Sequence, residues 1–220
     1  GNVGRRIDRM AGYLGFKVLK NDPPRMKEEG PYGFCSLDYL LANSNVVTLH
    51  VPLNPTTRGM ADDAFFEKIR PGTTFINASR GEVVVDAALK RAIPKLGPVI
   101  IDTWNHEPDI DRELLEMVDI ATPHIAGYSY QGKQNGTAAA VRAVARYFSI
   151  QELYEFFPRA EELELESIKL NLKGKPQGEV TSVLQYNYPI FTDDFMLRMA
   201  PEKFEELRAN YQYRREFYVD

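Results

Sequence analysis

The sequence has 220 residues, of which 44% are hydrophobic and 26% charged, and its formal net charge is −4 at pH 7. These values are typical of a soluble globular protein with room for more than one domain. The acidic balance offers no basic surface to a nucleic acid, and no apolar run reaches the roughly 20 residues that cross a bilayer. We therefore expect a cytoplasmic protein with no nucleic-acid or membrane partner. Cys35 is the only cysteine, which excludes an internal disulfide and a multi-cysteine metal site, and we expect no metal.

Helical and strand patterns alternate over residues 1–150. A helix is predicted around Ile7, Met10 and Leu14, followed by a turn at Pro23-Pro24. Strands are predicted at 16–19, 46–49, 73–77, 98–102 and 120–122, and further helices at 37–42, 62–69, 86–92 and 129–149. Strands separated by helices indicate a parallel sheet with crossovers, which is the doubly wound α/β class of the Rossmann fold.

The pattern changes after residue 150. Apolar residues alternate in one phase at Leu163 and Leu165 and in the opposite phase from Ile168, so we expect two strand segments with a bulge near Ser167. A loop is predicted at Gly174, Pro176 and Gly178, and helices at 191–199 and 201–211. We expect residues 151–220 to form a second, small α+β domain.

The chain opens with a glycine turn that is typical of a dinucleotide site. Gly1-Asn2-Val3-Gly4 begins a helix, and the following strand segment ends near Asp22. Two glycines at this spacing and an acid about 20 residues later fit the G-x-G-x-x-G fingerprint. A glycine lets the backbone approach a pyrophosphate, the helix N-terminus binds that anion, and Asp22 can accept hydrogen bonds from the ribose of NAD.

The fingerprint lacks its first glycine and the strand that precedes it. We therefore expect residues 1–150 to be an N-terminally truncated nucleotide domain without the first strand of its sheet. A capping glycine beside an exposed Asp22 would explain the same residues without a ligand. Arg25 could instead pair with the 2′-phosphate of NADP.

Three polar segments follow predicted strands. Residues 77–81 read Asn-Ala-Ser-Arg-Gly, residues 102–108 read Asp-Thr-Trp-Asn-His-Glu-Pro, and residues 122–127 read Thr-Pro-His-Ile-Ala-Gly. Ligands bind at the carboxyl ends of strands in an open α/β sheet. We therefore expect Arg80, Glu107 and His124 to meet at one edge of the sheet.

These residue types suit the oxidation of a 2-hydroxy acid. His124 can take the hydroxyl proton as a hydride leaves the same carbon, because imidazole changes protonation near neutral pH. Glu107 can hydrogen-bond to the ring, and Arg80 can bind the substrate carboxylate with its planar guanidinium. Asp102, at a strand end, could accept a hydrogen bond from the nicotinamide amide.

Other assignments are open at this point. His106 lies beside Glu107 and could be the acid–base residue in place of His124. His50, at the end of a strand, fits a structural or cofactor-lining residue better than a catalyst. Trp104 fits the core or a pocket wall.

With these motifs in order, residues 1–150 resemble the NAD-binding domain of the D-2-hydroxyacid dehydrogenase family. The resemblance implies that Arg80 anchors the substrate, that Glu107 assists and that His124 is the acid–base residue. The implied NAD contacts are Gly1, Asn2, Val3, Gly4, Asp22, Val51, Ala78, Arg80, Asp102 and Gly127.

Within the family, the sequence is most similar to members that act on a small phosphorylated hydroxy acid. The likeness rests on Asp22-Pro23-Pro24-Arg25, on the run from His124 to Thr137 and on the tyrosine- and arginine-rich stretch 210–216. It implies that Tyr128 contacts the substrate and that residues 151–220 form a dimerisation domain, so we expect a homodimer. This stretch alone should be inactive, because the family's substrate domain is absent from it.

Three alternatives remain at this stage. The chain could belong to another 2-hydroxyacid dehydrogenase, such as a 3-phosphoglycerate dehydrogenase. It could be an NAD-sensing binding module, since some relatives act as corepressors and an intact triad does not exclude that role. It could also be a fragment that only dimerises.

Overall fold

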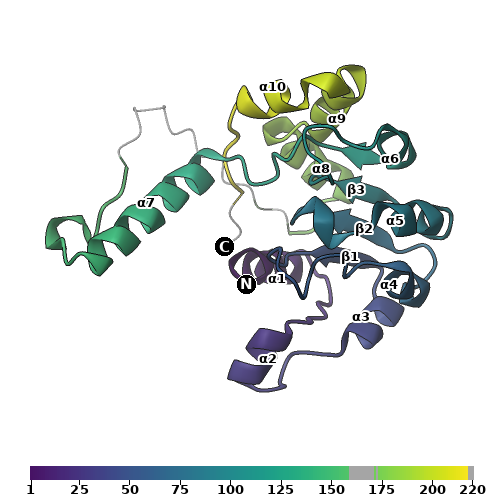
Figure 1. The fold of residues 1–220 in the computed structure, drawn as a ribbon, viewed down its shortest axis with the longest axis horizontal. Helices are drawn as coiled ribbons and strands as arrows, with labels where there is room; N and C mark the ends of the chain where they lie inside the picture. Colours follow the sequence, from purple (N-terminus) through teal and green to yellow (C-terminus); the bar gives the residue numbers. More distant parts are fainter. Residues whose placement is uncertain (159–170, 172, 218–220) are drawn as a thin grey trace. The chain divides into compact units, whose positions relative to one another are not determined.

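The computed structural model describes residues 1–158, 171 and 173–217 (Figure 1). Contacts divide the chain into two compact units. Of the described residues, the N-terminal unit contains Gly1–Ala126 and Phe191–Asn210, and the second unit contains those of Gly127–Ile190 and residues 211–217. The division differs from the expected boundary at residue 150, because part of the C-terminal segment belongs to the N-terminal unit. None of the described helices is long and apolar enough to cross a membrane.

A parallel sheet forms the centre of the N-terminal unit. Its four strands lie in the order β1-β2-β3-β4. Their bounds are Val46–Leu49, Thr74–Asn77, Val99–Ile101 and Ile120–Ala121. Val47 pairs with Phe75, and Ile76 pairs with Ile100, so the strands are rich in the β-branched and aromatic side chains that sheets favour. These four predicted strands and the parallel α/β class are confirmed.

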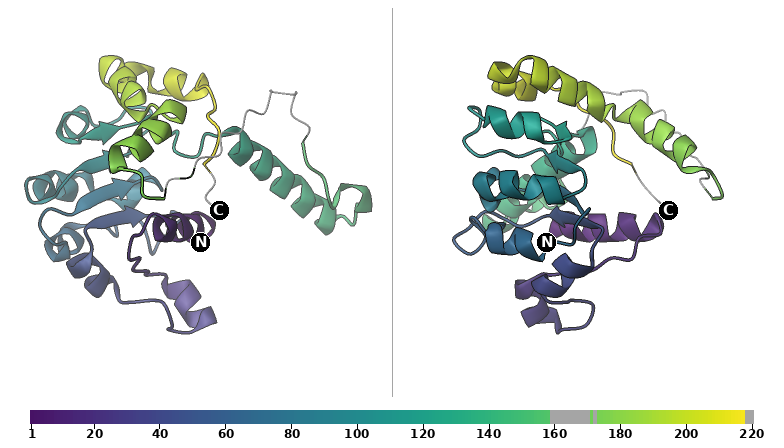
Figure 2. Two further views of the ribbon diagram at one scale, coloured as in Figure 1. Left: turned by 180° about the vertical axis from the view of Figure 1, so that it is seen from behind. Right: turned by 90° about the vertical axis from the view of Figure 1, so that its right-hand side faces the viewer.

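Three helices connect the successive strands. They are α4 (Asp63–Lys68), α5 (Asp86–Ala92) and α6 (Arg112–Met117). Both Figure 1 and Figure 2 show them along one side of the sheet, where α4 packs on α5 and α5 on α6. Parallel strands require such crossovers. The carboxyl ends of the strands therefore share one edge, where the polar segments 78–81, 102–107 and 122–126 begin.

Side-chain caps fix where several helices begin. Ser36 accepts a hydrogen bond from the Tyr39 backbone N–H at the start of α3 (Leu37–Asn43). Asp62 and Asp111 cap α4 and α6 in the same way. Each cap stabilises its helix by about 1 kcal/mol, because it satisfies a backbone donor that has no partner within the helix. The predicted helices at 37–42, 62–69 and 86–92 are confirmed to within a residue or two.

Two predictions near the N-terminus are wrong. Residues 16–19 follow α1 (Asn2–Tyr13) but form no strand, because no strand of the described sheet lies beside them to pair with. Pro23-Pro24 does not simply turn the chain but begins a helix, α2 (Pro23–Glu29), whose first turn tolerates proline since its N–H groups need no partner there.

The sequence patterns did not predict α6 or α8 (Gln177–Asn187). Helix α6 has only 6 residues, too few for a clear period. Helix α8 contains Gly178, so the expected loop at this residue is wrong; a glycine lowers helix propensity but is tolerated in a first turn. The strands expected around Ser167 lie outside the described residues.

The segment 191–210 completes the core of the N-terminal unit. It contains most of α9 (Ile190–Met199) and all of α10 (Phe204–Ala209). Leu197 and Phe204 are 0% and 1% exposed within the same core as the sheet. Burying one such side chain contributes roughly 1.5–3 kcal/mol. The predicted helices at 191–199 and 201–211 are therefore present, and they are part of the nucleotide domain's core.

Helix α9 also covers the outer strand of the sheet. The Asp194 carboxylate accepts a hydrogen bond of 2.7 Å from the Ala121 backbone N–H on β4. Arg198 is paired with Asp194 and donates to the carbonyl oxygens of Leu115 and Val118 at the end of α6. An exposed strand edge invites pairing with another chain. The contact with Asp194 gives the Ala121 N–H on the outer strand a hydrogen-bond partner, and the contacts of Arg198 hold α9 against α6.

The second unit contains α7 (Tyr130–Tyr147), the long helix predicted at 129–149 (Figure 1). Ser129 caps it by accepting from the Gly132 N–H. The C-terminal stretch is held to its start, where the Tyr130 N–H donates to the Arg214 carbonyl oxygen over 3.0 Å. Glu216 accepts from the Ser129 hydroxyl over 2.8 Å.

Candidate active site

The turn after β2 presents Arg80 to the sheet edge. Asn77 is buried, and its Oδ1 accepts hydrogen bonds from the Ser79 N–H and hydroxyl, while its Nδ2 donates to the Arg80 carbonyl. These bonds close a tight turn. The Arg80 side chain is exposed and donates from Nη1 to the Ser79 carbonyl oxygen over 2.6 Å.

Gly81 lets the next loop approach this turn. A Cβ atom at this position would lie 2.0 Å from the carbonyl carbon and oxygen of Trp104, so any other residue would force the two backbones apart. Trp104 is buried, and its indole donates to the Thr122 carbonyl over 3.0 Å. The three segments are therefore packed on one another through Trp104, which is a wall residue as expected.

Asp102 holds the loop that carries His124. Its Oδ1 accepts from the Thr122 hydroxyl over 2.7 Å and from the Ile125 and Ala126 N–H groups over 2.8 and 3.0 Å. Burial raises the pKa of Asp102, although these hydrogen bonds act in the opposite direction. The structure therefore gives this carboxyl a role that the sequence did not suggest: it orients residues 122–126.

His124 has a strained backbone. Its φ of 57° lies in the left-handed region, which a residue with a Cβ adopts only when its surroundings impose it. The His124 N–H donates to the carbonyl oxygens of Asp102 and Thr122 over 2.8 and 3.0 Å. The strain is thus maintained by the loop's own hydrogen bonds, and His106 has a similar φ of 59°.

Glu107 and His124 form a hydrogen-bonded pair. Glu107 Oε2 lies 2.8 Å from His124 Nδ1, and Glu107 Oε1 accepts from the Trp104 N–H over 2.8 Å. Both carboxylate oxygens are engaged, so the side chain is held in one orientation. The expected hydrogen bond between these two residues is confirmed, and it leaves His124 Nε2 available to another partner.

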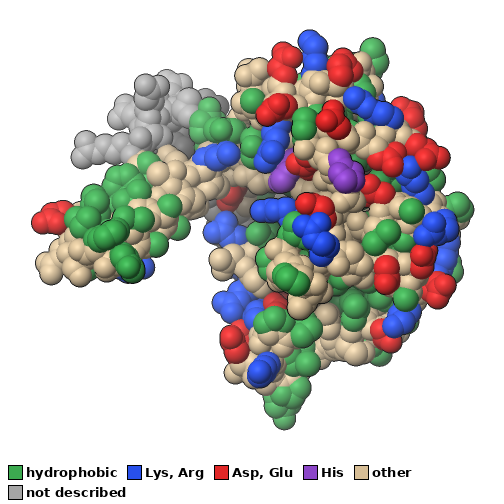
Figure 3. Space-filling model, viewed as in Figure 1, with side chains coloured by type: hydrophobic (Ala, Val, Ile, Leu, Met, Phe, Trp, Pro, Cys, Tyr) green, Lys and Arg blue, Asp and Glu red, His purple; other side chains and the backbone are tan. Residues whose placement is uncertain are grey.

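Arg80, Glu107 and His124, the expected catalytic residues, line one cleft of about 510 Å³, and Arg58 is a second arginine in its wall. The lining residues are Leu53, Arg58, Arg80, Gly81, Glu82, Trp104, His106, Glu107 and His124. Figure 3 shows histidine side chains at the surface beside acidic and basic ones. His106 shares the cleft, but it is His124 that Glu107 binds.

Two residues near this cleft were not predicted. Arg58 lies at the cleft and comes within 3.9 Å of Glu82, and its side chain is 61% exposed. Arg208 of α10 brings Nη1 to 3.9 Å from Glu107 Oε2. Arg58 could have been suspected because it follows the strand end at residue 49. No sequence signal linked Arg208 to this site, since its position depends on how α10 packs.

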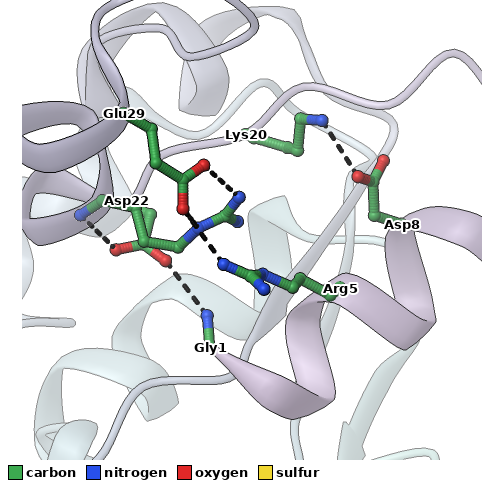
Figure 4. Close-up of polar contacts among 7 residues, drawn as sticks. Gly1, Arg5, Asp8, Lys20, Asp22 and Glu29 are labelled. Atoms are coloured by element: carbon green, nitrogen blue, oxygen red, sulfur yellow. Dashed lines mark hydrogen bonds and ion pairs between the residues drawn. The ribbon is translucent and has the colours of Figure 1, made fainter.

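The start of α1 and Asp22 lie together at the expected dinucleotide end (Figure 4). The Gly1 nitrogen is 3.1 Å from Asp22 Oδ2. The Asp22 carboxylate also accepts a hydrogen bond of 3.2 Å from the Arg25 N–H. No side chain caps α1, and a Cβ at Gly1 would meet no atom within 4 Å. The helix start is therefore open to an anion.

Arg25 is engaged within its own helix. Its Nε and Nη2 donate to the two carboxylate oxygens of Glu29 over 2.8 and 2.7 Å, and its guanidinium lies 5.1 Å from the Phe34 ring centre. Arg5 also contacts Glu29 over 3.0 Å. The cation that could have favoured a 2′-phosphate is therefore paired with a carboxylate of its own helix.

His50 adds an unsatisfied polar atom near this helix. Its Nε2 lies 3.1 Å from the Thr48 hydroxyl, and its buried Nδ1 has no hydrogen-bond partner in the described part of the chain. Burial lowers the pKa of His50, which keeps the ring neutral near pH 7. An added Cβ on Gly4 would lie 3.8 Å from the His50 Cβ. A ligand at the start of α1 could supply the missing partner.

The remaining expected contacts are placed as follows. Asn2 and Val3 are exposed at the start of α1, and Val51 and Ala78 are half-buried just after β1 and β2. Gly127 and Tyr128 belong to the second unit. There the Tyr128 ring packs edge-on against Tyr211 and Tyr213 and faces the Lys133 ammonium at 3.8 Å.

Comparison with known proteins identifies the family. The model of the NAD-binding domain of D-isomer-specific 2-hydroxyacid dehydrogenases matches residues 1–126. The chain belongs to this family, and the resemblance inferred from the three polar segments is confirmed. The family's domain binds NAD, as the glycine turn and Asp22 predicted.

Individual relatives narrow the similarity. The chain is 40% identical over 222 aligned positions to an erythronate-4-phosphate dehydrogenase of Bacteroides thetaiotaomicron, which covers 98% of this chain and 61% of the relative. The erythronate-4-phosphate dehydrogenase of Yersinia pestis is 37% identical, and the alignment covers 99% of this chain and 60% of that protein. The chain thus spans about three fifths of these relatives.

A solved structure agrees with the fold. The D-lactate dehydrogenase of Aquifex aeolicus, crystallised with NAD and lactic acid, is similar with a TM-score of 0.57 and 28% identity. The match covers 74% of this chain and 56% of that one. The Rossmann-type α/β class is therefore confirmed.

Proposed function

We propose that this chain is part of an enzyme that oxidises 4-phospho-D-erythronate to its 2-oxo acid with NAD, a step of pyridoxal phosphate (vitamin B6) biosynthesis. The named relatives support the substrate, and the family supports the reaction class. The observation that carries the proposal is the Glu107–His124 pair, 2.8 Å apart in a cleft that Arg80 also lines.

His124 acts as the base in this proposal. Its Nδ1 is committed to Glu107, so Nε2 takes the proton of the C2 hydroxyl. The carboxylate of Glu107 stabilises the imidazolium that forms, as acid–base pairs require. Arg80 binds the substrate carboxylate and polarises the oxygen on C2.

Bound NAD would accept the hydride that leaves C2 as the carbonyl forms. The chain's own residues fit this cofactor at three places. The uncapped start of α1 can bind the pyrophosphate, Asp22 can accept from the ribose hydroxyls, and buried His50 Nδ1 lacks a partner in the described residues. Val51, Ala78, Asp102 and Gly127 are proposed as further contacts by their family positions.

A phosphorylated substrate suits the charge of the cleft. Arg58 and Arg80 are both at the cleft, so a molecule with an anionic group at each end could meet a cation at each. We assign the carboxylate to Arg80 and propose Tyr128 as a further substrate contact. The complete enzyme is proposed to be a cytoplasmic homodimer.

The test compares two histidines in the full-length protein. Changing His124 to Ala should lower kcat by roughly 10²- to 10⁴-fold, the usual share of acid–base catalysis, with NAD affinity retained. Changing His106 to Ala, which lies in the same cleft, is the matched control and should leave most of the turnover. Wild-type turnover in the His124 variant would overturn the assignment.

A further inference from the structure

The carboxylate of Glu107 has a third neighbour besides the Trp104 N–H and the His124 ring. Arg208 Nη1 lies 3.9 Å from Glu107 Oε2, the same oxygen that binds His124. The Arg208 side chain is 36% exposed and the Glu107 side chain 19%. The ion pair is therefore partly shielded from solvent, where charges interact more strongly than on an open surface.

The backbone of the Arg208 segment is fixed independently of this ion pair. Phe204, one turn earlier on α10, is 1% exposed, and Leu207 packs against the same core. Before it, Asp194 and Arg198 hold α9 to β4 and to the end of α6. The packing of α9 and α10 on the core therefore places Arg208 beside Glu107.

We propose that Arg208 is a positioning residue of the active site, whose positive charge beside the Glu107 carboxylate offsets part of the attraction of Glu107 for a protonated His124. The proposal rests on the proposed function. In this proposal the segment 191–210 contributes a residue to the active site of its own chain. The three catalytic motifs, which all lie before residue 127, gave no indication of that contribution.

The charged groups around the pair set the direction of the effect. Besides Arg208, the ionisable groups that line the cleft with Glu107 and His124 are Arg58, Arg80, Glu82 and His106, and Asp102 interacts electrostatically with His124. Without the positive charge of Arg208, Glu107 should attract the protonated His124 ring more strongly, which favours the protonated form of the ring. Oxidation needs the neutral ring, so the rising limb of kcat/KM against pH should move to higher pH, by about half a unit for a partly screened charge at this range.

The experiment uses three variants of the full-length protein. Arg208→Met should shift the limb and lower kcat, and Arg208→Lys should restore the limb because it keeps the charge. Lys203→Met removes a cation from the same segment, where Lys203 pairs only loosely with Glu206 at 3.8 Å, and should leave the limb in place. The pH at which the His124 ring titrates, followed by NMR, should move in parallel with the kinetic limb.

An unmoved limb and ring titration in Arg208→Met would overturn the inference, even if stability fell, because a purely structural Arg208 predicts only that loss. Failure of the proposed function looks different. In that case the wild-type protein would not oxidise the substrate at all, or His124→Ala would remain active, while the NMR comparison of the Arg208 variants would still be readable.

Discussion

At the scale of single residues, Asp102 carries a buried carboxyl that holds the loop through one of its two oxygens. Its Oδ1 accepts from Thr122, Ile125 and Ala126, and an amide oxygen could accept the same three bonds. Burial raises the pKa of Asp102. A carboxyl with a raised folded pKa stabilises the fold fully below its unfolded value, and that contribution is lost as pH rises through the folded value.

Asp102→Asn should therefore stabilise the protein near pH 7. The difference in free energy of unfolding from wild type should be close to zero near pH 3.5 and should grow as pH rises, by about 1.4 kcal/mol for each unit of raised pKa. Urea unfolding at a series of pH values measures it. A variant less stable than wild type at pH 7 would show that the carboxylate itself holds the loop.

At the scale of elements, Asp22 joins the start of α1 to the start of α2. It lies 3.1 Å from the Gly1 nitrogen and also caps α2 through the Arg25 N–H. Arg25 is held by Glu29, so the ionised Asp22 should repel the 2′-phosphate of NADP. Asparagine keeps the cap but removes the charge.

Asp22→Asn should narrow the preference for NAD over NADP by about tenfold, which corresponds to 1.4 kcal/mol of lost repulsion. Fluorescence titration of the full-length protein with both cofactors measures it. Asp62→Asn, which alters the cap of α4, is the control and should not change the preference. Wild-type protein that binds NADP as tightly as NAD would contradict the account.

The elements also show what sequence patterns can and cannot predict. Arg80, Glu107 and His124 were found because each follows a buried strand, and parallel strands bring their carboxyl ends together. The prediction of a strand over 16–19 was wrong, because a segment becomes a strand only when another strand lies beside it to pair with, and the local sequence does not show that. Arg208 could not be found, since Leu197 and Phe204 look like any apolar residues of a helix until their partners are known.

At the scale of the whole molecule, α9 has two apolar faces. Leu197 is buried in the N-terminal unit, whereas Phe191, Phe195 and Met199 recur every fourth residue and are 58%, 58% and 68% exposed. Residues 151–220 were expected to form a separate domain, but the first face of α9 packs in the core of the N-terminal unit. The second face supports the proposed homodimer, because exposed aromatic and methionine side chains in a row are typical of subunit contacts.

Phe195→Glu should therefore weaken the dimer. Burying an unpaired carboxylate in an apolar contact is strongly unfavourable, so the dissociation constant should rise by at least roughly tenfold, or 1.4 kcal/mol. Light scattering coupled to size exclusion measures it. Tyr32→Glu changes a side chain that is 93% exposed and lies off this face, and it should leave the dimer intact. An unchanged dimer in the Phe195 variant would place the contact elsewhere.

The cleft of Arg80, Glu107 and His124 is proposed to belong to an NAD-dependent dehydrogenase of 4-phospho-D-erythronate. The most direct measurement is the steady-state kcat/KM of the full-length protein, with NAD, for this substrate and for 3-phosphoglycerate. NADH should form from the first substrate with a kcat/KM at least roughly 100-fold higher than from the second, a preference of about 2.7 kcal/mol in transition-state binding. Faster turnover of 3-phosphoglycerate would assign the site to a different member of the family. NAD binding without turnover of any 2-hydroxy acid would contradict the claim and would indicate a cofactor-sensing module.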